Sequence, residues 1–188
     1  GGAVMLPLWL KLCIWIGVGG LAMAAMEPWS KIVHGRLWHR KLWSVHYTHH
    51  VVPRRGFEWN DLLASSHVPV AIALIYYASV TESSVSREII LAIGMGMTAF
   101  GAIYAIFHEG VCHERLPVSF LLRWKWVQEI RKAHLVHHHT DGPPYGLMLG
   151  RRELETFRRS GVTLSDEGRR PEVVAREKAR ALSGSSER

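Results

Sequence analysis

The sequence contains only two cysteines, Cys13 and Cys112, among its 188 residues. Two cysteines so far apart provide neither a disulfide framework nor a paired-thiolate metal site, and we expect both to be reduced thiols. The chain also lacks a haem-attachment signature and a GxGxxG fingerprint for a flavin or nicotinamide nucleotide. Redox chemistry in this chain would therefore depend on a different cofactor and on electrons from outside.

Charged residues are absent from two long apolar stretches, residues 62–80 and residues 89–107. Each stretch has 19 residues. A helix of that length, rising ~1.5 Å per residue, crosses a hydrocarbon core of ~30 Å. A third apolar run, residues 4–26, is interrupted only by Lys11. We therefore expect an all-α fold, an integral membrane helical bundle with at least three membrane helices.

The first apolar run has a second interpretation. Lys11, the apolar residues after it and the sequence Ala22-Met23-Ala24 also resemble a signal peptide with its cleavage site. Cleavage there would export the segment around His34, away from cytosolic sources of electrons. A retained helix that continues to His34 is the simpler prediction.

Acidic residues are scarce, with 16 Asp and Glu against 23 Lys and Arg, which gives a formal net charge of +7. The distribution of the basic residues does not indicate a nucleic-acid-binding protein. Six lie between the first two apolar runs and fifteen follow Phe107, whereas the loop at residues 81–88 has only Arg87. This asymmetry follows the positive-inside rule and predicts a cytosolic, histidine-rich helical cap on the bundle. Its basic surface suits anionic lipid headgroups and an acidic protein partner.

Histidine, by contrast, is abundant, and eleven of the twelve histidines lie in four clusters at the ends of the apolar runs or between them. The clusters are His34 and His39; His46, His49 and His50; His108 and His113; and His134, His137, His138 and His139. Neutral imidazole is a good ligand for iron, zinc and copper. This concentration of imidazole at one depth predicts a polynuclear metal site.

Two of the clusters repeat the spacing i, i+3, i+4. On an α-helix these positions share one face, so each triplet can direct several ring nitrogens to a common point. Two such triplets facing each other would enclose two metal ions. The triplets are His46, His49 and His50, and His134, His137 and His138.

The other two clusters, His34 with His39 and His108 with His113, have a spacing of five residues. At ~100° per residue, positions five apart are separated by ~140° around an α-helix. Two such rings cannot share one ion on an undistorted helix. Either the helix unwinds at these points, or the two rings serve different ions, or one ring only supports a ligand.

Familiar metal motifs do not fit. HEGVCH begins with His108 and Glu109, but its second histidine stands at i+5, whereas the zinc-protease motif needs i+4. A ferritin-like di-iron site needs Glu-x-x-His pairs, which these histidines lack. A metal transporter would place its ligands at mid-membrane rather than outside the apolar runs. We leave His67, inside an apolar run, and His139, off the face of its triplet, out of the ligand set.

Six segments together resemble the β-carotene 3-hydroxylase family: HGRLWH, HYTHH, PRRGFEWNDLLA, HEGVCHERLP, AHLVHHH and PYGLMLG. The histidine pattern alone is shared with the wider superfamily of membrane di-iron hydroxylases and desaturases. The segments at residues 56–61, 108–113 and 144–146 are more specific to carotenoid hydroxylases. The resemblance covers roughly residues 26–150, and it includes Glu27. The chain departs from the family pattern in the two valines before Pro53 and in the additional His139.

The resemblance implies a membrane non-haem di-iron monooxygenase that inserts one oxygen atom from O2 at carbon 3 of a β-ionone ring. β-Carotene would pass through β-cryptoxanthin to zeaxanthin, with electrons from reduced ferredoxin or a similar donor. The alternative is another lipid oxygenase of the superfamily, which would act on a fatty acid, a sterol or a sphingoid base, or a carotenoid ketolase.

The resemblance also implies which residues hold two iron ions. The implied ligands or near-ligands are His34, His39, His46, His49, His50, His108, His113, His134, His137 and His138. Glu58, Asn60 and Asp61 would orient those imidazoles, and Asn60 or Asp61 would cap the helix from Leu62.

Four helical membrane segments are typical of the family, so we expect residues 116–127 to form a partial or interfacial one, giving three to four in all. Residues 1–150 are predicted to form the membrane hydroxylase domain. Residues 151–188 are predicted to be a polar C-terminal tail, partly disordered, with a short surface helix at residues 171–182. Three glycines on or near one helix face favour close helix packing over a path for a flat polyene; they are Gly94, Gly96 and Gly101.

Overall fold

The computed structural model describes residues 6–51 and 56–159, and every regular element in these ranges is helical. In chain order the elements are α1 (Leu8–Val33), the π-helical segment η1 (His34–Trp38), α2 (Trp43–Val51), α3 (Trp59–Ala64), α4 (Val68–Val80), α5 (Val85–Tyr104), the π-helical segment η2 (Ala105–Cys112), the 3-10 helix η3 (Ser119–Arg123), α6 (Lys125–Thr140) and α7 (Gly150–Arg159). The predicted all-α fold is confirmed for this part of the chain. The predicted helix at residues 171–182 lies outside it.

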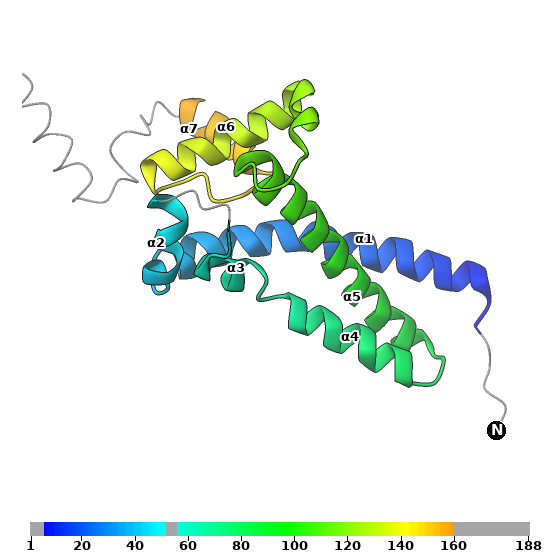
Figure 1. The fold of residues 1–188 in the computed structure, drawn as a ribbon. Coiled ribbons are helices and arrows are strands. Elements are labelled where there is room, and N and C mark those ends of the chain that lie inside the picture. The colour runs from blue at the N-terminus through cyan, green and yellow to red at the C-terminus, as the bar shows by residue number, and fades with distance from the viewer. Residues whose placement is uncertain (1–5, 52–55, 160–188) are drawn as a thin grey trace, which may run out of the picture.

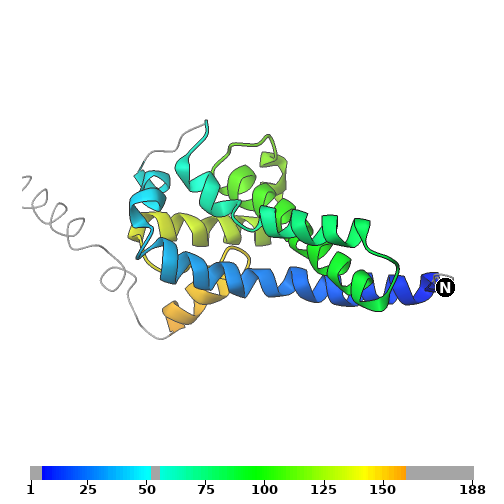
Figure 2. The ribbon, with the colours of Figure 1, turned by 90° about the horizontal axis from the view of Figure 1, so that it is seen from below.

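Three helical stretches are long and apolar enough to cross a membrane, namely residues 8–38, 59–80 and 85–112. The second and third contain the predicted runs 62–80 and 89–107, and the first covers residues 8–26 of the predicted run 4–26. Large apolar side chains on their outer surfaces, such as Ile16 and Ile72, are exposed as they would be against lipid. In Figure 1, α4 and α5 form an antiparallel hairpin and α1 crosses α5, and Figure 2 shows the same arrangement from below.

Glycines allow the three spanning helices to approach closely. A Cβ atom added at Gly96 would lie 2.3 Å from the carbonyl oxygen of Gly19, where α5 crosses α1. A Cβ atom added at Gly94 would lie 2.8 Å from Cγ1 of Ile75 on α4. Both glycines therefore serve helix packing, as the sequence favoured. The third, Gly101, faces His67 instead.

A group of paired charges joins α1 to α5 near the α4–α5 loop. The carboxylate of Glu88 is fully buried and accepts a hydrogen bond of 2.8 Å from Nε1 of Trp15. Lys11 Nζ lies 3.6 Å from the same carboxylate, and Arg87 also pairs with it. The lysine that interrupts the first apolar run is thus the counter-ion of a buried acid, which is the usual arrangement for charges within membrane helices.

The remaining elements gather at the opposite end of the spanning helices (Figure 1). Residues 116–127, which the sequence predicted to be a membrane segment in part, form η3 and the beginning of α6 rather than a spanning helix. Phe120 and Trp126 are exposed there, consistent with an interfacial position. α7 begins one residue before the predicted tail, packs on α6 and buries Leu154.

Candidate metal centre

Two π-turns bring the histidines spaced by five residues onto a common side. The backbone N–H of His39 donates to the carbonyl of His34, and that of His113 donates to the carbonyl of His108, each at 3.0 Å. An i→i+5 hydrogen bond widens the helix so that residues five apart lie about one turn apart. Of the three arrangements left open by the spacing, the helices adopt the distorted one, and each pair of rings faces a single site.

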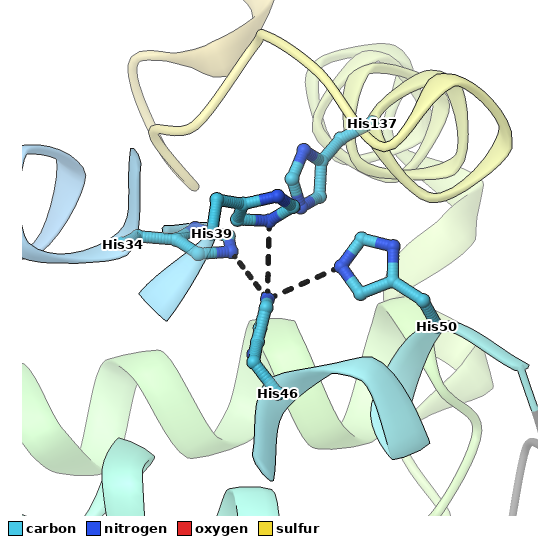
Figure 3. Close-up of side chains that lie close together, drawn as sticks. All are labelled: His34, His39, His46, His50 and His137. Carbon is cyan, nitrogen blue, oxygen red and sulfur yellow. Dashed lines mark hydrogen bonds between the residues drawn. The ribbon is translucent and has the colours of Figure 1, made fainter. Parts of the chain in front are cut away.

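Five imidazoles converge in a group that we call the first cluster: His34, His39, His46, His50 and His137. The Nε2 atom of His46 lies 2.9 Å from Nε2 of His34, 3.2 Å from that of His39 and 3.1 Å from that of His50. Figure 3 shows these rings pointing toward one another from η1 and the residue that follows it, from α2 and from α6. Within the cluster each histidine offers one nitrogen within 4.8 Å of every other.

Four further imidazoles form a second cluster: His49, His108, His113 and His134. The Nε2 atoms of His113 and His134 are 2.9 Å apart, and the ring centroids of His49 and His113 are 4.2 Å apart. His138 lies between the clusters. Its ring stacks on that of His50 at 4.2 Å and lies 4.5 Å from that of His134. All ten predicted ligands are therefore in or between the two clusters.

The spacing of each triplet suggested that its rings would be directed to one point. In the structure the rings of each triplet divide between the two clusters. His46 and His50 contribute to the first cluster and His49 to the second, while His134 contributes to the second and His137 to the first. Positions i+3 and i+4 differ by ~100° around the helix, which is enough to direct neighbouring rings to different sides. Each triplet thus joins the two clusters.

Five of these imidazoles have an oxygen acceptor at their second ring nitrogen. The acceptors of the Nδ1 hydrogen bonds are the Tyr145 carbonyl for His34 (2.9 Å), Asn60 Oδ1 for His46 (2.6 Å), the Gly142 carbonyl for His137 (2.6 Å), Glu58 Oε2 for His49 (3.1 Å) and Glu109 Oε1 for His108. Carbonyl and carboxylate oxygens only accept hydrogen bonds, so Nδ1 donates in each case. The Nε2 lone pairs of these rings then point into the clusters.

Burial favours the neutral form of an imidazole at physiological pH. Burial lowers the pKa of His46 and of His113 to about 4 and that of His138 to about 3. In a neutral ring whose Nδ1 donates, Nε2 has no proton. The Nε2 atoms of His34 and His46 are therefore two acceptors at 2.9 Å that cannot hydrogen-bond to each other.

A cation between such nitrogens removes this repulsion. Two nitrogens ~2.1 Å from one metal ion and at right angles are ~3.0 Å apart, which matches the spacings of 2.9–3.2 Å around His46. The buried Nε2 atoms of His49 and His138 have no hydrogen-bond partner in the described structure. The residues present therefore fit a group of metal ions held by neutral nitrogen ligands.

The three predicted supporting residues have separate contacts. Glu58 and Asn60 touch His49 and His46, whereas Asp61 touches no imidazole and pairs with Arg115 at 2.8 Å. The N-cap residue of α3 is Glu58 rather than Asn60 or Asp61, because the helix begins at Trp59, and Asp61 takes part as the third residue of a capping box. The Asn60 amide is engaged with His46, and the Asp61 carboxylate accepts a hydrogen bond of 3.0 Å from the backbone N–H of Glu58.

Arg115 closes a chain of hydrogen bonds behind the second cluster. Its guanidinium donates to Asp61 and also to Glu109, whose other oxygen accepts from His108. Asp61 in turn holds the backbone of Glu58, the partner of His49. Arg115 was not among the residues predicted for the site. It follows Glu109 by six positions, a spacing that suggests no contact on a regular α-helix, and the two side chains meet beyond the π-turn.

The loop after α6 is fixed by two acidic side chains. Glu153 on α7 accepts hydrogen bonds from the backbone N–H groups of Tyr145 and Gly146, each at 3.2 Å. Glu27 on α1, the residue noted in the family resemblance, accepts one of 2.9 Å from Leu149. These contacts position the Tyr145 carbonyl that accepts the hydrogen bond of the His34 ring.

The two histidines left out of the ligand set lie apart from both clusters. His139 is exposed on α6. His67 precedes α4 and lines a groove between α4 and α5. The fold and the site thus define a class, the helical membrane proteins with buried histidine clusters that could hold metal ions.

Known proteins of similar sequence identify the family. Over 138 residues the chain is 39% identical to "Beta-carotene 3-hydroxylase 2, chloroplastic" of Arabidopsis thaliana, covering 71% of this chain and 45% of that protein. It is 39% identical over 137 residues to "Beta-carotene hydroxylase 1, chloroplastic" of Capsicum annuum, covering 71% and 43%. It is 34% identical over 139 residues to "Beta-carotene hydroxylase" of Pantoea ananas, covering 73% of each. The chain belongs to the β-carotene hydroxylase family.

Protein-family models and solved structures gave no match. The chain spans slightly less than half the length of the plant relatives it matches.

Proposed function

We propose that this protein is a membrane non-haem di-iron monooxygenase that hydroxylates carbon 3 of the β-ionone ring of β-carotene, giving β-cryptoxanthin and then zeaxanthin. The observation that carries the proposal is the pair of buried clusters of neutral imidazoles in a chain of the β-carotene hydroxylase family. In each turnover one atom of O2 would enter the ring and the other would leave as water, with two electrons and two protons supplied from outside.

The proposed ligand set divides between two iron ions. One ion would be held by the first cluster and one by the second, and His138 would serve as a ligand or near-ligand between them. The bound metal would supply O2 activation, which an unactivated C–H bond requires and side chains alone cannot provide. Imidazole suits iron among other metals, and the choice of iron comes from the family.

The protein's own groups would hold this centre in one arrangement. The carbonyl and carboxylate partners fix the tautomer and the orientation of the rings, which is the general role of such groups at histidine metal sites. Burial of His46, His49 and His137 keeps water from their nitrogens. With no flavin or haem motif in the chain, we propose reduced ferredoxin or a similar acidic protein as the electron donor for the basic cytosolic surface.

The metal centre is proposed to lie on the cytoplasmic side of the membrane. Reporter fusions placed at Ser84 and after Arg188 are expected to give opposite signals, because the positive-inside rule places the Ser84 loop outside. A cytosolic enzyme reporter would be active after Arg188 and inactive at Ser84, and a periplasmic reporter would behave in reverse. Matching signals at the two positions would contradict this topology.

The proposed reaction is tested by pigment analysis. A host that makes β-carotene, expressing this chain with ferredoxin, is expected to accumulate β-cryptoxanthin and zeaxanthin, identified by chromatography and mass spectrometry. A host with the empty vector is the control. A 4-keto product, or unchanged carotene beside a hydroxylated fatty acid or sterol, would move the assignment to another oxygenase of the superfamily.

A further inference from the structure

A groove of about 690 Å³ lies between α4 and α5, on the membrane side of the metal centre. The two helices are in close contact at Gly94, midway along α5, and in Figure 1 they are closer at their shared loop than at their other ends. Small side chains line the groove, including Ala71 on α4, Ala102 on α5 and Ala105 at the start of η2. A volume of this size is typical of a site for a small organic molecule.

The groove opens on the lipid-facing surface. Ile72, one of its lining residues, is exposed on the outside of α4, so a molecule dissolved in the membrane can enter sideways. The other end of the groove is closed by the hydrogen-bonded side chains of Asp61, Glu109 and Arg115. An apolar ligand would therefore extend from the bilayer toward the second cluster.

Two small cavities between the groove and the imidazoles share lining residues with it. The first, of about 40 Å³, shares His67 and Tyr104 with the groove, and it also touches Trp38. The second, of about 10 Å³, again touches Tyr104 and Trp38 and is lined by His34 and His108. Tyr104 borders all three spaces, and its ring stacks on that of His108 with centroids 4.7 Å apart.

His67 stands at the junction of the groove and the first small cavity. Its Nε2 atom lies 2.6 Å from the position that a Cβ atom at residue 101 would take, so the ring can rest against α5 only because residue 101 is glycine. A larger residue there must displace the ring, and the open spaces beside it are the groove and the small cavity.

We propose that the groove between α4 and α5 binds the polyene chain of the carotenoid, that the ring end reaches the metal centre past Tyr104, and that Gly101 and His67 set the width of this path. The inference rests on the proposed function for the identity of the ligand. It assigns a specificity role to His67, which was left out of the ligand set predicted from the sequence.

The test measures both carotenoid binding and turnover in full-length protein. Binding of β-carotene is followed by quenching of tryptophan fluorescence, and turnover by the KM and kcat for β-carotene. Filling the groove with Ala102→Phe, or displacing the His67 ring with Gly101→Ala, is expected to weaken binding and raise KM by about tenfold, since the added bulk would occupy the space proposed for the polyene. Iron content is expected to stay at the wild-type value in both variants.

Two further variants separate a specific path from a general loss of packing. The double variant Gly101→Ala/His67→Ala removes the displaced ring and is expected to recover binding. Gly17→Ala is the matched control, because a Cβ atom there would meet nothing within 4 Å.

Each outcome decides one claim. If Ala102→Phe and Gly101→Ala both keep wild-type binding, KM and hydroxylation, the groove is not the binding site of the carotenoid. Failure of the double variant to recover binding would overturn the role of His67. A third outcome is that the wild-type protein binds carotene, that Ala102→Phe weakens this binding, and that no hydroxylation is ever observed. This result would contradict the proposed function and still support the groove as a carotenoid-binding site.

Discussion

Replacing His49 or His137 by alanine is expected to reduce hydroxylation of β-carotene by more than about 100-fold, a larger loss than removal of an outer hydrogen-bond partner usually causes. The two residues belong to different clusters, and each is buried with its Nδ1 held by an oxygen acceptor. Alanine removes the ligand nitrogen and leaves the helical backbone unchanged. Pigment chromatography after co-expression measures the activity.

His139→Ala provides the matched control for this prediction. It removes a histidine from the same helix as His137, but His139 is exposed and belongs to neither cluster. Circular dichroism of all three variants should show wild-type helix content, and His139→Ala should keep wild-type activity. Full activity in His49→Ala or His137→Ala would contradict the proposed ligand set.

Replacing Arg115 by alanine is expected to lower activity by ~10–100-fold, the usual effect of losing a group that orients metal ligands. The change leaves the carboxylates of Asp61 and Glu109 without the cation they share. Glu109 is then free to leave His108, and Asp61 to release the backbone of Glu58 beside His49. Because both imidazoles belong to the second cluster, iron content should fall toward one ion per chain.

Arg159→Ala is a suitable comparison for Arg115→Ala, since Arg159 makes an exposed ion pair with Glu155 on α7. Exposed pairs of this kind contribute little to stability. Arg115→Lys should recover only part of the activity, because a single ammonium group cannot reproduce the forked contacts of the guanidinium. Wild-type iron content and activity in Arg115→Ala would show that the hydrogen-bond chain has no part in holding the second cluster.

Much of the fold could be predicted because the bilayer imposes a simple rule on the sequence. Runs without charge of the length needed to cross the membrane correspond to the spanning helices. Lys11, the exception in the first run, is explained by Glu88, which lies 77 positions further along the chain. No local pattern could reveal that pair. The apolar character of residues 116–127 likewise could not distinguish an interfacial segment from a short span.

The candidate site could be predicted in its residues more readily than in its geometry. The spacings of the triplets placed His46 and His50 on one side, but the division of each triplet between two clusters depends on how α2 and α6 face each other. The π-turns at His34 and His108 could not be inferred from propensity, because they depend on tertiary packing.

The partners of the imidazoles were the least predictable part of the site. Several are backbone carbonyls, such as those of Tyr145 and Gly142, and a carbonyl leaves no trace in the sequence. Arg115 and Asp61 meet across 54 positions of the chain. Only the folded structure brings these groups behind the clusters.

The most direct test of the central claim is the number of iron ions in protein purified without oxygen. Two separate groups of buried, neutral imidazoles predict close to two ions per chain, with His49→Ala retaining about one, measured by elemental analysis together with Mössbauer spectroscopy of ⁵⁷Fe-labelled protein. A fully active wild-type protein that contains a single iron ion, or none, would contradict the account.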